Sequence, residues 1–217
     1  MKYLMSKTRT RCHAINYDGT EIYVSDLLSY GNDKLSSNIA IFDLPAIETC
    51  LNCGDCKHDC YAMKAQRQYP DTYTKRALNY YIAEKRPYTF EALVVCQLAY
   101  KPRPYVRIHS SGDFFSQEYI DAWARIVATF PEIQFYSYTK VDHLFDFSNL
   151  TSLSNFNLVR SVLPCGSQNF GPKKDIIHLA KKHKAAVCPY GLINQKVKCG
   201  DKCRACMTRE HVVFLQH

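Results

Sequence analysis

The chain has 217 residues, 47% hydrophobic and 22% charged, with 8 Gly and 9 Pro. This composition excludes a disordered, collagen-like or low-complexity protein, because enough apolar side chain is present to bury a sizeable core in one domain, with or without a small appended module. The balance of 28 Lys and Arg against 20 Asp and Glu, +8 in all, is compatible with nucleic acid or an anionic cofactor and diagnostic of neither.

The N-terminal segment combines charged residues with an alternating pattern. Charges interrupt residues 1–19, where a signal peptide would carry its apolar core. No stretch of the chain approaches the roughly 18 to 20 consecutive apolar residues of a membrane span. We therefore expect a soluble, cytoplasmic protein without a membrane partner. Residues 11–24 alternate on both sides of Asp18-Gly19, a turn signal that predicts a β-hairpin.

A short apolar strand within residues 38–50 leads into a first cysteine group. Its spacing, C-x2-C-x2-C-x3-C, lets neighbouring thiolates turn toward one centre and matches the bacterial ferredoxin spacing for a [4Fe–4S] cluster. With no signal peptide and an odd total of 11 cysteines, metal binding is favoured over disulfides. The predicted ligands are Cys50, Cys53, Cys56 and Cys60.

The rest of the chain alternates between helical and extended patterns. Apolar spacing predicts helices at 72–85, 89–100, 116–130 and 175–184, and strands at 105–110, 132–138, 157–163 and 185–189. Such alternation implies parallel pairing with right-handed crossovers. We predict an α/β fold with a partial (β/α) barrel-like parallel sheet, an N-terminal β-hairpin region and a Cys-rich C-terminal tail. The predicted division is a domain at 1–187 and a metal-binding tail at 188–217 packed on it.

Polar residues follow the predicted strands, where ligands of parallel α/β folds bind. Asp113 suits a cofactor or substrate ligand, or alternatively a helix N-cap, a role that Ser116 also fits. His109 suits proton transfer or a hydrogen-bonded core position. Lys140 suits an anionic group or a solvated loop. The positions after strands proposed for catalysis are Asp113, His109 and Lys140.

Two basic side chains raise separate questions. Arg107 alternates with Val106 and Ile108, so it faces away from their apolar side and needs an acidic or anionic partner if buried. Arg76 and Asn79 lie three residues apart on one helical face and could bind a cluster or its ligand.

Most of the 27 Tyr and Phe residues lie on periodic apolar faces, which favours a core role over nucleobase stacking.

A second cysteine group closes the chain, with C-x3-C-x2-C at its end. Its members are Cys188, Cys199, Cys203 and Cys206. Four thiolates accept either an iron–sulfur cluster or a structural Zn²⁺, since both take tetrahedral sulfur ligation. Among the isolated cysteines, Cys96 lies in an apolar run and is predicted to be a small core residue. Cys12 and Cys165 carry no assigned role.

These motifs resemble the phage gene product 88 family. The resemblance is carried by FDLPAIETC, CKHDCYAMKA, KRALNYY, VRIHSSGDFFSQEYIDAW, FYSYTK and a late AVCP followed by further cysteines, and it covers most of the chain from Ile39 onward. The family pattern matches Cys50, Cys56 and Cys60, which makes Cys53 an addition. The family implies a phage or mobile-element protein and supplies no settled activity.

A more distant similarity is to the first half of a radical SAM barrel, in the order cysteine loop, helix, strand with a Gly-acid turn, helix, strand. It implies a [4Fe–4S] cluster with one iron open to S-adenosylmethionine. It also implies that Ser111, Gly112 and Asp113 lie near that cofactor. With Arg76 and Asn79, proposed from their shared helical face, these are the predicted cofactor-binding residues. The usual C-x3-C-x2-C loop occurs instead at the C-terminal cysteines.

The resulting hypothesis is an iron–sulfur protein of phage type, a radical-SAM-like or other redox enzyme, with one or two [4Fe–4S] clusters and an electron donor as partner. The alternative hypothesis is a non-catalytic phage protein, held together by zinc at one or both cysteine groups, that binds nucleic acid or a host protein. Zinc content and a steep loss of affinity with salt would distinguish the alternative.

Overall fold

The computed structural model describes residues 13–17, 20–24, 26–58, 60–160, 170–171, 176–182, 184–189, 197–209 and 211–215. The strands are β1 His13–Tyr17, β2 Thr20–Val24, β3 Leu28–Tyr30, β4 Ile39–Phe42, β5 Tyr105–Ile108, β6 Gln134–Thr139, β7 Phe156–Arg160, β8 Phe170–Gly171, β9 Ala186–Val187 and β10 Val212–Leu215. The helices are α1 Tyr61–Gln68, α2 Pro70–Lys85, α3 Pro87–Tyr100, α4 Gln117–Thr129, α5 Ser148–Thr151, α6 Ile176–Lys182 and α7 Ala205–Thr208. Among the described residues, no helix is long and apolar enough to span a bilayer.

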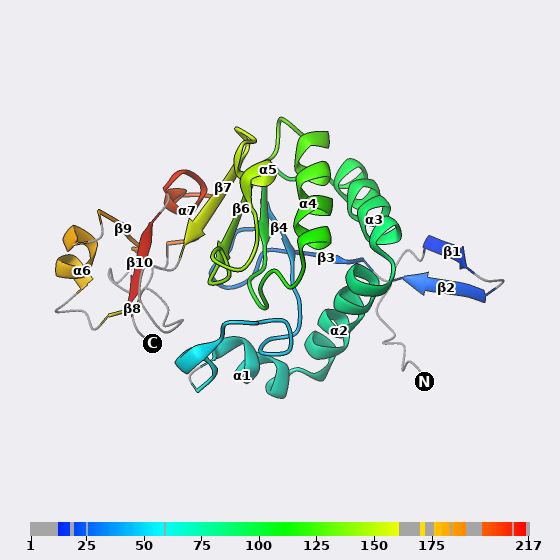
Figure 1. Ribbon diagram of the computed structural model, residues 1–217, viewed down its shortest axis with the longest axis horizontal. Coiled ribbons are helices and arrows are strands. Elements are labelled where there is room, and N and C mark those ends of the chain that lie inside the picture. The colour runs from blue at the N-terminus through cyan, green and yellow to red at the C-terminus, as the bar shows by residue number, and fades with distance from the viewer. Residues whose placement is uncertain are drawn as a thin grey trace.

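A five-stranded sheet forms the centre of the molecule, in the order β3-β4-β5-β6-β7 (Figure 1). Strands β4 to β7 are parallel, which confirms the predicted α/β class, and β3 pairs antiparallel with β4 at one edge. The described strands form an open sheet, and no pairing between β3 and β7 closes it into a barrel. The predicted hairpin is confirmed by antiparallel β1 and β2.

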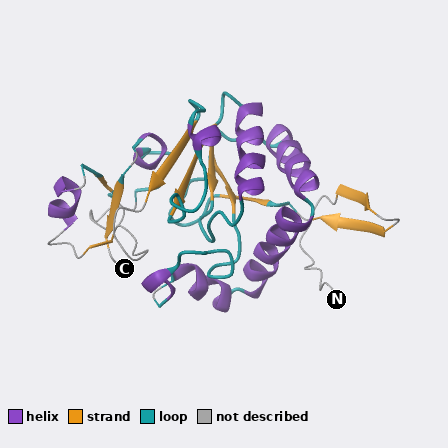
Figure 2. Ribbon diagram, in the orientation of Figure 1, coloured by secondary structure: helices purple, strands orange, loops and turns teal. Residues whose placement is uncertain are grey.

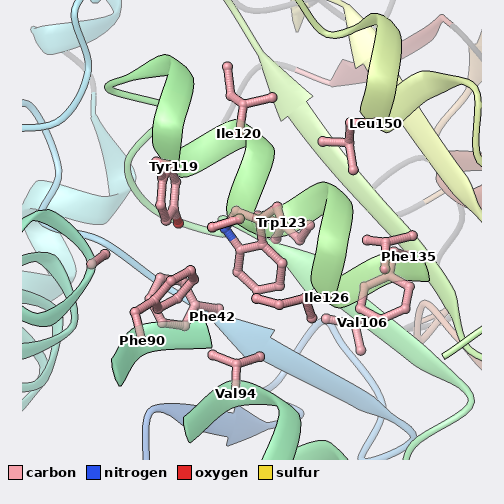
Figure 3. Close-up of a cluster of buried hydrophobic side chains, with 14 of the residues drawn as sticks. Phe42, Phe90, Val94, Val106, Tyr119, Ile120, Trp123, Ile126, Phe135 and Leu150 are labelled. Atoms are coloured by element: carbon pink, nitrogen blue, oxygen red, sulfur yellow. The ribbon is translucent and has the colours of Figure 1, made fainter. Parts of the chain in front are cut away.

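One face of the sheet packs against helices. Phe42, Val106 and Phe135 point into this layer and are fully buried. Trp123 of α4 lies at its centre, with ring centroids 5.4 Å from Phe42 and 5.5 Å from Phe90 in edge-to-face geometry (Figure 3). Helices α3 and α4 lie on this side in Figure 2. Burial of large aromatic rings at this interface makes it the main apolar core of the described chain.

The opposite face is covered by the C-terminal tail. Ile39, Ile41 and Tyr136 form a second cluster with Met207 of α7. Gly200 fits closely against this face, because a Cβ atom there would lie 2.9 Å from the Ile39 side chain. Strand β10 pairs with both β8 and β9, so a small second sheet joins residues on both sides of position 188. The tail therefore acts as the second layer over the central sheet.

Local signals placed most helix starts correctly. Ser116 caps α4, and its Oγ accepts a hydrogen bond from the Tyr119 N–H, as predicted. Helix α3 starts two residues before the predicted position because Pro87 fits the first helical turn.

The prediction that Cys96 is a core residue is wrong. Its side chain is exposed, because α3 turns Phe90 and Val94 to the core instead. Cys12, Cys165 and residues 161–163 lie outside the described residues.

Candidate functional site

The first cysteine loop lies over the carboxyl ends of the parallel strands. The Leu44 N–H donates to the Ser111 carbonyl at 3.0 Å, beyond β5. Asn52 donates from Nδ2 to the Lys140 carbonyl at 2.8 Å, beyond β6. The Tyr61 hydroxyl, which follows the last cysteine, donates to the Ser110 carbonyl. Three separate contacts thus fix residues 44–61 at the strand ends where parallel α/β folds bind ligands, below the sheet in Figure 1.

Within this loop the cysteines lie on consecutive tight turns. The Cys50 N–H donates to the Ile47 carbonyl, and the Cys56 N–H donates to the Cys53 carbonyl. The Cys53 thiol donates to the Cys50 carbonyl at 3.0 Å. Cys60 immediately precedes α1. In the part of the chain that is described, no three Cys, His, Asp or Glu side chains are already arranged to hold a metal ion.

Cys50 is the cysteine of this loop whose pKa is shifted most by burial. Burial, with smaller contributions from the nearby Asp113 carboxylate, Cys53 and Cys60, raises its pKa to about 12. The thiol is therefore protonated at neutral pH without a cation beside it. Metal binding requires thiolates, so a bound cation would release this proton. The interaction between Cys50 and Asp113 also brings the cysteine loop and the turn after β5 into one site.

Asp43 organises the base of this site. It follows β4 directly and accepts hydrogen bonds from the Ser110 N–H at 2.6 Å and the Ser111 N–H at 3.0 Å. The Ser110 hydroxyl lies 2.7 Å from both carboxylate oxygens. Sequence analysis missed this residue, although an acidic side chain directly after a buried strand was the available signal.

Arg76 and Asn79 support Asp43 from α2. Arg76 forms a buried ion pair with Asp43, with 3.2 Å between Nη2 and Oδ2, and Nη1 donates to the Ala62 carbonyl and to Gln66 Oε1. Asn79 donates to the Asp43 and Leu27 carbonyls. These contacts join α1 and α2 to β4. Arg76 Nε and Asn79 Oδ1 are buried and have no hydrogen-bond partner among the described residues, and the cofactor role of these two residues stays a prediction.

The turn after β5 is held closely to the cysteine loop. Gly112 has φ +85°, and a Cβ atom there would lie 2.6 Å from both Leu44 Cβ and Thr49 Oγ1. Gly112 therefore serves loop packing, with no room left on that side for a ligand. Ser111 is different, because its buried hydroxyl has no hydrogen-bond partner among the described residues.

Asp113 joins the ends of β5 and β6. Its Oδ1 accepts from the Phe114 N–H at 2.8 Å and the Thr139 hydroxyl at 2.9 Å. Its Oδ2 accepts from the Lys140 N–H at 2.9 Å, which leaves one lone pair. Burial raises the Asp113 pKa to about 6, against the opposing effect of these hydrogen bonds. It does not cap α4, because Ser116 does.

His109 and Lys140, the other two predicted catalytic residues, make ordinary structural contacts. His109 is 3% exposed, its Nε2 lies 2.8 Å from the Tyr119 hydroxyl, and its ring meets Phe114 edge to face. Burial, with Arg107 nearby, lowers the His109 pKa to about 3, so the ring is neutral at physiological pH. Lys140 contacts the site through its backbone, to Asp113 and Asn52.

The second cysteine group converges on one small cavity. The cavity is lined by Tyr136, Cys188, Cys199, Cys203, Arg204, Ala205, Cys206, Met207 and Val212. Burial raises the Cys206 pKa to about 12, while a hydrogen bond with Tyr138 opposes this shift. Cys199 pairs with the backbone of Leu35 and of Cys203 through isolated bridges. All four predicted thiols thus line the same cavity, without yet being arranged to hold a metal ion.

Comparison with known proteins agrees with the sequence motifs. The family model described as Gene product 88 matches residues 26–191, which include the first cysteine group, the strand ends and Cys188. The Gene 88 protein of Mycobacterium phage D29 is 43% identical over 58 residues, or 27% of this chain and 24% of that protein. The Gene 88 protein of Mycobacterium phage L5 is 40% identical over 58 residues, with the same shares.

This chain therefore spans about a quarter of the length of the curated relatives it matches. No solved structure matches it. The family match covers well over half of the 217 residues and takes in the first cysteine loop and the strand ends, so the resemblance to this phage family is confirmed. The chain belongs to the Gene product 88 family.

Proposed function

We propose that this protein is an iron–sulfur redox protein whose first cysteine group holds a [4Fe–4S] cluster at the strand ends. The observation that carries the proposal is the position of the loop, which Asn52 and Tyr61 fix over β6 and β5 beside Asp113. A purely structural metal site has no need of that position. Cysteine thiolates at this spacing are the ligands that such a cluster takes.

The residues that would hold the first cluster are Cys50, Cys56 and Cys60, with Cys53 as a fourth ligand or a bystander. Cys53 donates its thiol to the Cys50 carbonyl, a hydrogen bond that is lost when the thiol deprotonates to bind metal. With three ligands, one iron would stay open to S-adenosylmethionine, and the cluster, once reduced by an electron donor, would supply the electron for its reductive cleavage. Among the described residues, the polar atoms available for such a cofactor include the unpartnered Ser111 Oγ, Arg76 Nε and Asn79 Oδ1 and one lone pair of Asp113 Oδ2.

The second group would hold an auxiliary cluster or Zn²⁺ through Cys188, Cys199, Cys203 and Cys206. These thiols line one enclosed cavity between the sheet and the tail. A metal there would join the tail to the central sheet and add to the free energy of folding. This group therefore serves structure whichever metal it takes, while the first group carries the chemistry.

Anaerobic purification followed by iron, sulfide and zinc analysis tests the proposal, together with EPR of the reduced protein with and without S-adenosylmethionine. We expect at least one four-iron cluster that is lost in Cys56→Ala and kept in Cys96→Ser. Cys96 is a matched control because it is exposed on α3 and belongs to neither group. A Cys53→Ala variant that keeps its cluster and gains or retains a SAM-dependent spectrum indicates an open iron. Two zinc ions without iron contradict the proposal.

A second candidate function is binding of single-stranded nucleic acid, which the surface of α1 to α3 favours. Six tyrosines there are between 41% and 84% exposed: Tyr61, Tyr69, Tyr73, Tyr81, Tyr88 and Tyr100. For these rings the expectation of a core role is wrong. Tyr69, Tyr73 and Tyr81 are spaced in multiples of four along α2, with exposed Lys85 one further step on.

Exposed rings permit base stacking, and Lys85, which also pairs with Glu84 at 3.1 Å, could contact a phosphate. Fluorescence anisotropy with a labelled single-stranded oligonucleotide tests this candidate. Binding that weakens steeply with salt and is lost in the triple variant Tyr69→Ala, Tyr73→Ala, Tyr81→Ala supports it. Unchanged binding in that variant excludes this surface as the site.

A further inference from the structure

The central sheet presents two polar side chains on the face where the second cysteine group lies. Val106 and Ile108 of β5 are buried in the helix-facing core, so Arg107 between them points to the face that the tail covers. Tyr136 of β6 pairs with Arg107 across the strands and lines the cavity of the second group. The guanidinium carbon of Arg107 lies 4.9 Å from the ring centroid of Tyr138, two residues further along β6. A cation and a phenol therefore lie together on this face.

Cys206 is held by two strands of the sheet. Its carbonyl accepts a hydrogen bond from Asn157 Nδ2 of β7 at 2.9 Å. Its thiol forms a hydrogen bond with the Tyr138 hydroxyl of β6. Tyr138 and Cys206 also pack together in both small apolar clusters on this face, one of which contains Cys199 and the other Cys188. Asn157 thus fixes the backbone of Cys206, while Tyr138 orients its sulfur.

The hydrogen bond between Tyr138 and Cys206 suits a metal-bound sulfur. A cysteine that ligates a metal is a thiolate, which accepts hydrogen bonds and has no proton to donate. The Tyr138 hydroxyl can donate to that thiolate, so this contact is kept when metal binds. In the first group the Cys53 thiol donates to the Cys50 carbonyl, and that contact is lost on metal binding.

Arg107 places a permanent positive charge near the same thiols. It interacts electrostatically with Cys206 and with Cys199. Its Nε donates to the His109 carbonyl at 3.2 Å, which holds the guanidinium in place. Within the described ranges Arg107 forms no ion pair with Asp or Glu. A zinc ion held by four thiolates carries a net charge of about −2, so a loaded second group would supply the counter-charge of Arg107.

The charged neighbours of Cys199 differ in sign from those of Cys50. Lys34 and Arg107 act on Cys199, and Arg204 lines the same cavity. Cys50 of the first group instead lies near the Asp113 carboxylate. Positive charge stabilises thiolates and negative charge opposes them. The second group is therefore the better placed of the two to carry four negative ligands at once.

We propose that Tyr138 and Arg107 form the outer layer of a metal site at the second cysteine group, where Tyr138 donates to the metal-bound sulfur of Cys206 and Arg107 offsets the negative charge of the thiolates. Neither side chain ligates the metal, so both are positioning residues. The inference rests on the part of the proposed function that assigns a metal to this group, and it applies to zinc and to an iron–sulfur cluster alike. Outer partners of metal ligands typically change metal affinity by about 10- to 100-fold.

Metal release from the full-length Cys56→Ala variant tests the proposal, because this variant keeps the second group intact while the first group lacks a ligand. Excess chelator is added, and the released zinc and iron are followed with time. We expect Tyr138→Phe and Arg107→Met, each made in this background, to release the metal about tenfold faster or more. Arg107→Lys should restore much of the slow release, since lysine keeps the positive charge.

Cobalt gives a spectroscopic readout that a general loss of packing would not change. After the second-group metal is replaced by Co²⁺, Tyr138→Phe should move the sulfur-to-cobalt charge-transfer band to longer wavelength, because a thiolate without its hydrogen bond gives up electron density more readily. Tyr80→Phe and Arg125→Met are the matched controls. Tyr80 donates its hydroxyl to Glu84 on α2, and Arg125 pairs with Glu91 on the helix side. Neither control should change the band or the release rate.

Unchanged release with an unmoved cobalt band in Tyr138→Phe overturns the proposal, as does unchanged release in Arg107→Met. Circular dichroism verifies that each variant is folded, and Tyr138→Phe carries the test if Arg107→Met does not fold. Arg107→Met is also made in the wild-type background. Equally faster release from both cysteine groups there indicates a general loosening of the fold and overturns the role of Arg107.

The same samples separate this inference from the proposed function. A Cys56→Ala protein that holds no metal and takes up no Co²⁺ has no second metal site, which overturns the inference whatever the first group binds. Release that depends on Tyr138 and Arg107 in a protein that holds only zinc supports the inference while contradicting the iron–sulfur function.

Discussion

Asp43 and Ser110 are joined through both the backbone and the side chain of the serine, across the gap between the ends of β4 and β5. The Ser110 N–H lies 2.6 Å from Asp43 Oδ1, and its hydroxyl lies 2.7 Å from each carboxylate oxygen. Arg76 neutralises the same carboxylate from α2. This arrangement explains why the strand ends form a firm base beneath the cysteine loop.

Removal of this carboxylate should destabilise the protein strongly. In Asp43→Ala the buried Arg76 loses its ion-pair partner and the two serine N–H groups lose their acceptor. A broken buried pair costs about 3 to 5 kcal/mol. Urea unfolding, followed by the fluorescence of Trp123, measures the change. Glu91→Ala breaks the exposed pair with Arg125 and should cost at most about 1 kcal/mol, so equal losses would contradict this account of Asp43.

Two glycines allow the two cysteine groups to be disturbed separately. Gly112→Ala places a Cβ atom 2.6 Å from Leu44 Cβ, and Gly200→Ala places one 2.9 Å from the Ile39 side chain. Both positions also have positive φ, which costs an L-residue about 1 to 2 kcal/mol. Gly112→Ala should lower metal retention at the first group and Gly200→Ala at the second, as measured by metal analysis and thiol counting. The same pattern of loss in both variants would mean that the groups are not independent.

The stability of the protein should depend on pH through two opposing titrations. Asp113 has a folded pKa of about 6, above its unfolded value, so the native state binds more protons and this contribution falls as pH rises from about 4 to 6. His109 has a folded pKa of about 3, below its unfolded value, so its contribution rises as pH increases from about 3 to 6.5. Between pH 4 and 6 the two effects partly cancel.

Single variants should separate these titrations. Asp113→Asn should make the free energy of unfolding rise more steeply from pH 4 to 6 than in wild type. His109→Asn should make the slope more negative, and asparagine tolerates the positive φ of 67° at this position. Urea unfolding at several pH values provides the measurement. Parallel curves for the three proteins would show that neither group titrates in this range.

Cys96 should react first with a thiol reagent in the native protein. Its side chain is exposed on α3, whereas Cys188 is 2% exposed. Burial also raises the Cys50 pKa to about 12, which lowers its thiolate fraction and its reactivity. A thiol-reagent time course of wild type and Cys96→Ser tests this, and the fastest phase should vanish in the variant. Persistence of that phase would place the most accessible thiol elsewhere.

The amino-acid sequence by itself determined the class of fold and the identity of the two cysteine groups. Alternating apolar residues predict β5 and β6, and helical spacing with a Ser116 cap predicts α4, because these patterns depend on residues near one another in the chain. Cysteine spacing depends on the same local geometry. The structure confirms these strands and helices and brings the four C-terminal thiols to one cavity.

Only the tertiary structure decided which side chains face the site. Arg76 and Asn79 were predicted to address a cofactor, yet both bind around Asp43, 33 and 36 residues away. Cys96 was predicted to be core, but an all-apolar run has no periodicity to show which side of α3 is buried. Partners of this kind come from segments far apart in sequence, so no local pattern records them.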